Sequence, residues 1–175
     1  MRVWRSWLVL GMLLIPTAVR ADDHRADLYG GASRGGGGST LGGFHQTLAL
    51  GSARPVSKDL SFVLADVSAH FGNDVTQVAV MGGVRWTLFA KREQKHKVSG
   101  RGLLGLVHSN DGAPGPKDFA GAVGVSWEYI PTPTEPSKGW GVRVQYDYVI
   151  RSDADGRESF SRLSGGLVYR FGQHK

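Results

Sequence analysis

Residues 139–151 read GWGVRVQYDYVIR, and apolar and polar side chains alternate along them. The apolar set is Trp140, Val142, Val144, Tyr146, Tyr148 and Ile150; the opposing set is Gly141, Arg143, Gln145, Asp147 and Arg151. Only Val149 interrupts the polar set. Because successive side chains of a β-strand point to opposite faces, the segment predicts a strand with one apolar and one polar face.

The same alternation of period two recurs along the chain, whereas helical periodicity is hard to find after the N-terminal segment. Residues 76–88, 119–129 and 162–171 repeat it clearly, and residues 26–33, 43–51, 61–71 and 98–108 repeat it more weakly. In the segment 61–71 the pattern assigns Phe62, Leu64 and Asp66 to the polar face. Turn-forming runs separate the segments, among them 110–117 and 152–158. We therefore predict an all-β fold with eight antiparallel strands in up-and-down order.

The contents of the two faces predict which one meets the outside. The apolar faces carry many large aromatic residues, and the interior of an eight-stranded barrel is only wide enough to be filled by side chains. Those aromatics would overfill it, whereas charges can pair across a narrow lumen. This favours a transmembrane barrel with aromatics near the lipid interface. A soluble barrel of reversed polarity, carrying a small periplasmic ligand, is the alternative.

The N-terminal segment predicts export. Arg2 and Arg5 precede the apolar run 8–15, and residues 19–21, Val-Arg-Ala, suit a signal peptidase. The run is too short to cross a bilayer, which needs roughly 20 apolar residues. We predict a signal peptide over residues 1–21 and a barrel domain over residues 22–175. The sequence has no cysteine, which excludes disulfides and thiolate metal sites.

Two stretches resemble strands of the small outer-membrane β-barrel domain of opacity-like proteins. They are residues 60–72, LSFVLADVSAHFG, and residues 162–172, RLSGGLVYRFG. The resemblance covers nearly the whole mature chain as a pattern of strands. It implies a bacterial outer-membrane location, contact with outer-membrane lipid, and recognition of the aromatic at the end of the last strand by the outer-membrane assembly machinery. Phe171 matches that aromatic, although residues 172–175 follow it.

Charged residues on the polar faces form the candidate site. They are Asp66, Arg85, Arg101, Glu128, Arg143, Asp147, Arg162 and Arg170. Because unpaired charges are costly in a narrow interior, we expect them to pair and plug the lumen of a monomeric barrel. The expected role is structural, in envelope integrity. A narrow anion-leaning pore stays open as an alternative, because arginines outnumber carboxylates in this set.

Other chemistries have weaker support. His45 and His70 lack a placed third ligand, so no metal or other cofactor is predicted. His108 and Ser109 are adjacent and would point to opposite faces of a strand, so they cannot act as base and nucleophile and no enzyme activity is expected. The formal charge of +6 falls to about +3 once Arg2, Arg5 and Arg20 leave with the signal peptide. This modest excess does not indicate a nucleic-acid partner.

Overall fold

The computed structural model describes eight stretches of the chain. They are residues 24–36, 41–52, 60–72, 76–90, 95–110, 114–131, 139–153 and 156–171. The predicted signal peptide, residues 1–21, lies outside them. The strands are β1 (His24–Gly36), β2 (Leu41–Ser52), β3 (Leu60–Phe71), β4 (Thr76–Ala90), β5 (His96–Asn110), β6 (Pro114–Tyr129), β7 (Gly139–Asp153) and β8 (Gly156–Phe171). None of the described stretches contains a helix long and apolar enough to span a membrane.

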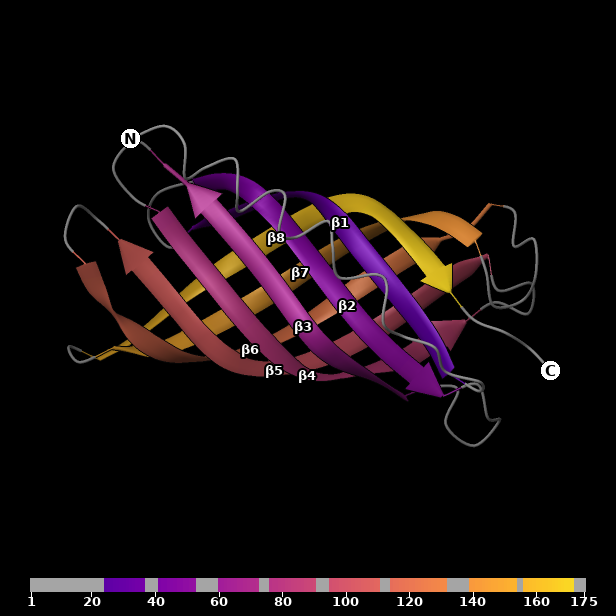
Figure 1. The fold of residues 1–175 in the computed structure, drawn as a ribbon, viewed down its shortest axis with the longest axis horizontal. Coiled ribbons are helices and arrows are strands. Elements are labelled where there is room, and N and C mark those ends of the chain that lie inside the picture. Colours follow the sequence, from indigo (N-terminus) through magenta and orange to yellow (C-terminus); the bar gives the residue numbers. More distant parts are fainter. Residues whose placement is uncertain are drawn as a thin grey trace.

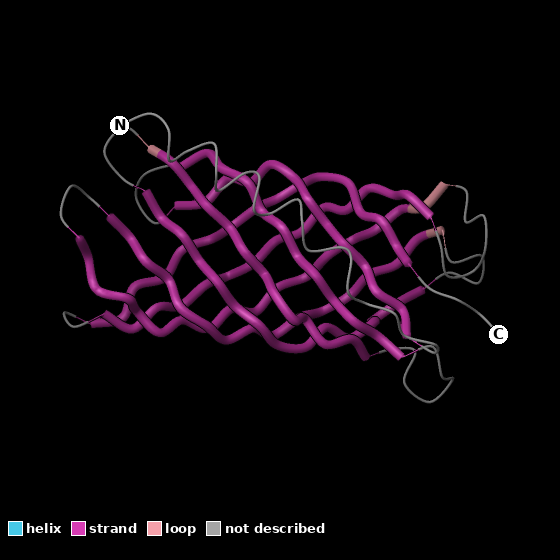
Figure 2. The backbone as a smooth tube through the Cα atoms, viewed as in Figure 1, coloured by secondary structure: helices cyan, strands magenta, loops and turns pink. Residues whose placement is uncertain are grey.

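The eight strands close into a single antiparallel barrel (Figure 1). Each strand pairs with the next in the sequence, and β8 pairs with β1 to complete the wall. All strands run obliquely to the long axis of the barrel (Figure 2). Closure leaves no unpaired strand edge, so every strand finds hydrogen-bond partners on both sides. The predicted fold class, eight antiparallel strands in up-and-down order, is confirmed.

Several strands are longer than the sequence pattern predicts. β6 begins at Pro114 and β8 begins at Gly156, inside the segments predicted as the turns 110–117 and 152–158. The extent predicted for those two turns is therefore wrong. The Gly-rich β1 also exceeds its predicted range of 26–33, because it pairs with both β2 and β8. Neighbouring strands supply backbone partners that override the weak local preference of glycine and proline against strands.

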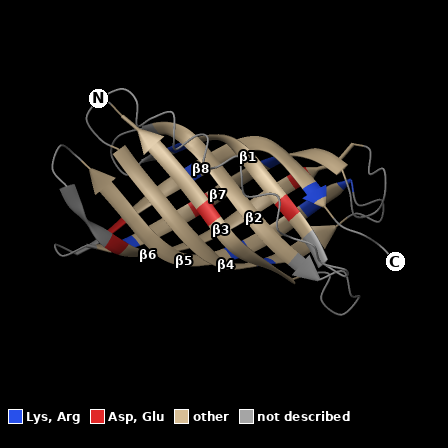
Figure 3. Cartoon of the chain, in the orientation of Figure 1, with Lys and Arg blue, Asp and Glu red and all other residues tan. Residues whose placement is uncertain are grey.

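The outer wall of the barrel is apolar and the interior is polar and charged. On β7, the outward-facing Trp140 is 63% exposed, whereas the inward-facing Arg143 is 1% exposed. The same contrast holds along β7 from Gly141 to Ile150, where buried and exposed positions alternate without a break. Figure 3 marks where charged residues lie along the strands, and Arg143 and Asp147 of β7 are both buried. The wall therefore has the polarity expected of a barrel that faces lipid.

One strand departs from the predicted alternation. The register of β3 against β4 shifts between Val63 and Asp66, which marks a β-bulge. Before the bulge, Phe62 and Leu64 are exposed (59% and 53%) and Val63 is buried; after it, Asp66 is buried. The assignment of Phe62 and Leu64 to the same face as Asp66 is therefore wrong. An extra residue in one strand of a pair moves all later side chains to the opposite face.

Part of the interior is apolar. A cluster of small and branched side chains lines the lumen on every strand from β2 to β8. Its members are Ala49, Val63, Ala79, Met81, Leu103, Val107, Ala120, Ala122, Val149 and Phe160. This cluster explains the apolar residues that interrupt the polar faces of β5 and β7, because Leu103, Val107 and Val149 belong to it.

Candidate functional site

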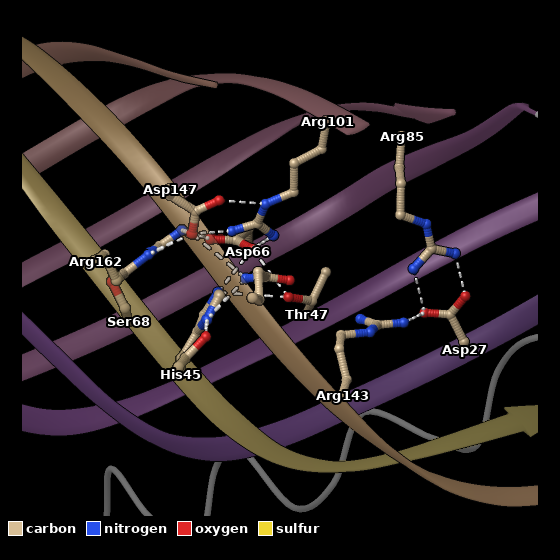
Figure 4. Close-up of polar contacts among 12 residues, drawn as sticks. Asp27, His45, Thr47, Asp66, Ser68, Arg85, Arg101, Arg143, Asp147 and Arg162 are labelled. Atoms are coloured by element: carbon tan, nitrogen blue, oxygen red, sulfur yellow. Dashed lines mark hydrogen bonds and ion pairs between the residues drawn. The ribbon is translucent and has the colours of Figure 1, made fainter. Parts of the chain in front are cut away.

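Four charged side chains form a closed ring inside the barrel, which we call the middle ring. It contains Asp66 of β3, Arg101 of β5, Asp147 of β7 and Arg162 of β8, so the two signs alternate. Arg101 binds both carboxylates, Asp66 at 2.7 Å through Nη1 and Asp147 at 2.6 Å through Nε. Arg162 also binds both, each at 2.9 Å. The ring links four strands, of which only β7 and β8 are paired in the sheet (Figure 4).

Neutral polar side chains complete the hydrogen bonding of the middle ring. Thr47 donates to Asp66 at 2.9 Å, and His45 Nε2 lies 2.8 Å from the same carboxylate oxygen. Arg162 donates to the Ser68 hydroxyl at 2.8 Å. Charges taken out of water are tolerated when their remaining donors and acceptors are satisfied. The middle ring meets that condition on both of its carboxylates and both of its guanidinium groups.

A second closed ring lies nearer the end of the barrel at which β1 begins and β8 ends, which we call the terminal end. This terminal ring contains Asp27 of β1, Arg85 of β4, Glu128 of β6 and Arg143 of β7. Arg85 binds Asp27 through both terminal nitrogens and lies 3.6 Å from Glu128. Arg143 binds Asp27 at 2.8 Å and Glu128 at 2.7 Å. Both rings therefore have the same alternating pattern and no net charge.

Tyr29 connects the two rings. Its ring meets His45 edge-on with the centroids 5.5 Å apart, and the Arg143 guanidinium carbon lies 5.0 Å from its centroid. Tyr29 is fully buried. A cation over an aromatic face is an attractive arrangement, and it strengthens when water is excluded. The two rings and Tyr29 thus form one continuous assembly along the lumen.

Solved structures with a similar fold exist, although no protein-family model matches the sequence and no curated protein matches it significantly. Neisserial surface protein A aligns with a TM-score of 0.61 at 14% identity, over 85% of this chain and 97% of its own. Ail, the attachment invasion locus protein of Yersinia pestis, aligns with a TM-score of 0.50 at 17% identity, over 86% and 100%. The outer membrane protein OprG of Pseudomonas aeruginosa aligns with a TM-score of 0.50 at 9% identity, over 87% and 98%.

The chain has the fold of the small eight-stranded outer-membrane β-barrels. The resemblance to opacity-like barrels is confirmed at the level of the fold. Sequence identities this low establish a shared fold but not a shared function, because one fold hosts many functions. What the barrel does must therefore be argued from its own side chains.

In this outer-membrane barrel fold, the structure brings all eight predicted network residues inside the wall. The middle ring takes Asp66, Arg101, Asp147 and Arg162, and the terminal ring takes Arg85, Glu128 and Arg143. Arg170 lies beside the terminal ring and binds Glu128 at 2.5 Å. Phe171, the predicted assembly signal, is the last residue of β8 and packs against Tyr169 on the outer surface.

The sequence reasoning missed Asp27, which completes the terminal ring. A weak signal was present: Asp27, Tyr29 and Ser33 occupy alternate positions of β1 and all three are buried. Glycines between and after them hid the alternation. Gly31 occupies the inward position between Tyr29 and Ser33. It lies directly opposite Gly166 on β8, and a Cβ there would come within 2.3 Å of the Gly165 carbonyl oxygen. Close approach of β1 and β8 therefore requires glycine there.

The two histidines considered as metal ligands serve the hydrogen-bond network. Within the described stretches no group of three or more possible ligands could hold a metal ion. His70 bonds to Ser33 at 2.9 Å, which ties β3 to β1. His45 lies between Ser164 (2.9 Å from Nδ1) and Asp66 (2.8 Å from Nε2), the order of groups in a serine-hydrolase triad. All three are buried, and Asp66 is already bound by two arginines.

Another charged group lies at the end of the barrel opposite the terminal end. Arg151 of β7 donates to the Glu158 carboxylate of β8 at 2.9 Å and to the Ser109 hydroxyl of β5 at 2.6 Å. It also lies 3.8 Å from Asp118 of β6. Glu158 is exposed, so this group reaches solvent on one side, unlike the two rings. It ties the ends of four strands together where the barrel wall stops.

Proposed function

We propose that this protein resides in a bacterial outer membrane and has a structural role in the envelope, with its lumen closed by the two rings. The single observation that carries the proposal is the middle ring, in which three of the four ion pairs cross the interior between strands that are not neighbours. Side chains joined in this way occupy the lumen of an eight-stranded barrel, which is only wide enough for side chains. A conducting path would require these pairs to separate.

The outer surface supports the membrane location. Twenty-three large apolar side chains are exposed on the described residues, and they lie on the six strands from β3 to β8. Trp140 packs against Tyr169 at the terminal end, with the ring centroids 4.7 Å apart. Amphipathic aromatics at one end of the wall suit a lipid–water interface. The same surface argues against the soluble periplasmic carrier, which would expose this apolar area to water.

Membrane lipid and the outer-membrane assembly machinery are the partners that this proposal requires. Phe171 at the end of β8 is the residue proposed for recognition by that machinery. The proposal includes a monomeric barrel, an N-terminal signal peptide over residues 1–21, and neither enzyme activity nor a cofactor. Residues 1–21 lie outside the described part of the chain, so processing at Ala21 is tested by the N-terminal sequence of the protein recovered from membranes.

A narrow anion-leaning pore is the second candidate. One observation favours it: Arg170 and Lys97 add positive charge beside the neutral terminal ring, and both side chains are only partly buried. An excess of cations at one mouth would attract anions. The pore requires a path through the middle ring, however, so it predicts measurable conductance for the unmodified protein.

Conductance across a planar lipid bilayer separates the two candidates. We expect the unmodified protein to give no stable conductance, and we expect Arg101→Ser combined with Asp147→Ser to open a measurable path. This pair of changes removes one cation and one anion, so the net charge of the lumen is preserved. The matched control is Arg34→Ser, which alters an exposed residue of β1.

The structural role needs a separate test in cells. A strain that lacks the protein should be more sensitive to detergent and to large antibiotics that an intact outer membrane excludes. Complementation with the unmodified gene and with the Arg34→Ser variant should restore resistance equally. Stable anion-selective conductance of the unmodified protein would favour the pore instead, and a deletion strain with unchanged resistance would contradict the structural role.

A further inference from the structure

The terminal end of the lumen contains an unusual set of buried hydrogen-bonding atoms without partners. Among the described residues, Ser99 Oγ, Ser126 Oγ and Arg85 Nε form no hydrogen bond and are shielded from solvent. Ser99 is 0% exposed, Ser126 2% and Arg85 4%. A buried polar group without a partner costs about 1–3 kcal/mol in proteins. Three such atoms in one region therefore indicate a missing partner.

These atoms lie on adjacent inward-facing positions of three neighbouring strands. Ser99 of β5 is directly opposite Ser126 of β6, and both side chains are buried. Arg85 of β4 is opposite Arg101, the next inward position of β5 after Ser99. Residues directly opposite in an antiparallel pair have Cβ atoms about 5 Å apart, and diagonal neighbours lie within reach of long side chains. The three atoms thus line one patch of the inner wall.

Lys97 lies on the same wall, two residues before Ser99 and directly opposite Glu128. The charge of Lys97 is attracted by Glu128 and Asp27 and repelled by Arg85 and Arg170. Its side chain is only partly buried, as is that of Arg170, so both remain in contact with water. Lys97 therefore supplies a further cation where the patch meets the terminal end.

The charge balance around the patch is positive. Four cations lie there, Lys97, Arg85, Arg143 and Arg170, against two carboxylates, Asp27 and Glu128. Both carboxylates are already bound by arginines. The described groups near the patch therefore leave an excess of two positive charges, and the atoms without partners are hydroxyl and guanidinium groups that can all donate. Acceptor oxygens with negative charge are what this set lacks.

We propose that the wall formed by Arg85, Lys97, Ser99 and Ser126 binds a small free oxyanion of the phosphate or sulfate class at the terminal end of the lumen. Its oxygens accept hydrogen bonds from both serine hydroxyls and from Arg85 Nε, and Lys97 supplies the balancing charge. The site lies inside the wall and faces away from lipid, so its ligand is a free anion and not a phospholipid headgroup. Because the site lies beside the terminal ring and not across the middle ring, it is compatible with a closed lumen.

The experiment is a titration of the full-length protein, folded in detergent micelles, with sodium phosphate at ionic strength held constant with sodium chloride. Binding is followed by calorimetry, and amide chemical shifts identify the residues involved. We expect saturable binding with shifts at Ser99 and Ser126. Lys97→Met should weaken the affinity at least about tenfold, the effect of losing one charged hydrogen bond. The matched control, Arg34→Met, removes one exposed cation of β1 and should leave the affinity unchanged.

Ser99→Ala provides a second arm that does not depend on the charge. Without phosphate the variant should be as stable as the unmodified protein, because an unpartnered hydroxyl is removed. With phosphate it should gain less stability than the unmodified protein, because a ligand stabilises the fold in proportion to its affinity. Gel mobility with and without boiling verifies that each variant folds. If Lys97→Met does not fold, the stability of Ser99→Ala with and without phosphate tests the site by itself.

Three results would overturn the site. They are the absence of saturable phosphate binding, unchanged affinity in both Lys97→Met and Ser99→Ala, and equal weakening in Arg34→Met. If phosphate leaves the shifts of Ser99 and Ser126 unchanged, water is the partner of the two hydroxyls and the proposal fails. None of these results bears on whether the barrel conducts, which the bilayer measurement decides separately.

Discussion

Arg162 of β8 and Asp66 of β3 form an ion pair of 2.9 Å, although β1 and β2 separate their strands in the wall. The pair therefore spans the interior and does not follow the sheet. Arg101 makes the corresponding connection from β5 to Asp66 at 2.7 Å. Each strand of the middle ring is thus joined by an ion pair to a strand that is not its neighbour in the sheet. Backbone hydrogen bonds join only neighbouring strands.

Asp66→Asn should destabilise the barrel strongly. The change leaves the positive charges of Arg101 and Arg162 without one of their two carboxylates, and breaking a buried ion pair in this way costs about 3–5 kcal/mol. Equilibrium unfolding in guanidinium chloride measures the difference. Glu158→Gln is the control, because Glu158 is 61% exposed and such pairs contribute only about 0–1 kcal/mol. Equal losses in the two variants would show that the middle ring carries no special stability.

Val144→Arg tests the outer wall. Val144 is an exposed residue of β7, and an arginine that faces lipid near the middle of the bilayer costs roughly 2–4 kcal/mol. We expect that loss in the free energy of unfolding measured in lipid vesicles. Val144→Leu, which keeps the position apolar, should differ little from the unmodified protein. An arginine variant of unchanged stability would contradict contact between this face and lipid.

Two adjacent glycines test the seam between β1 and β8. Gly166→Ala would place a Cβ within 2.2 Å of the Gly30 carbonyl oxygen, so the two strands must move apart, and overpacking of this kind costs roughly 1–3 kcal/mol. Gly165 has no heavy atom within 4 Å of an added Cβ, so Gly165→Ala should change stability by no more than ~0.5 kcal/mol. Unfolding of both variants under identical conditions measures the difference. Equal values would show that closure does not depend on this approach.

Phe171→Ala separates recognition during assembly from stability of the product. If the terminal aromatic is recognised in cells, the variant should lose most of its heat-modifiable band in the outer-membrane fraction, yet it should fold from urea into detergent as efficiently as the unmodified protein. Phe119→Ala is the control, since Phe119 is also an exposed aromatic but lies on β6 and not at the end of β8. A folding defect in detergent, or an equal loss in both variants, would remove the evidence for recognition.

The alternation of side chains along single strands determined much of the architecture. The segment 139–151 has a period of two that only a strand can satisfy, and Trp140 and Val144 are exposed where the pattern places them. The number of such segments gave the eight strands. This information is local, because the direction of each side chain depends on its parity within the strand and on nothing distant.

Where the backbone departs from regular pairing, the local pattern failed. The β-bulge between Val63 and Asp66 reverses the faces of β3, and no residue type in that stretch marks it. Glycines in β1 hid Asp27, since a strand that approaches β8 closely has few side chains from which to read a pattern. Both features arise from the fit of a strand against its two neighbours, which its own sequence does not contain.

The sequence by itself determined that Asp66, Arg101, Asp147 and Arg162 lie on polar faces, because parity within a strand fixes the face. Only the tertiary structure decided that these four close one ring and that Asp27 closes a second with Arg85, Glu128 and Arg143. The reason is geometric. Ion pairing requires separations of a few ångströms across the lumen, and those depend on the tilt and stagger at which all eight strands close, a property of the whole barrel and of no single segment.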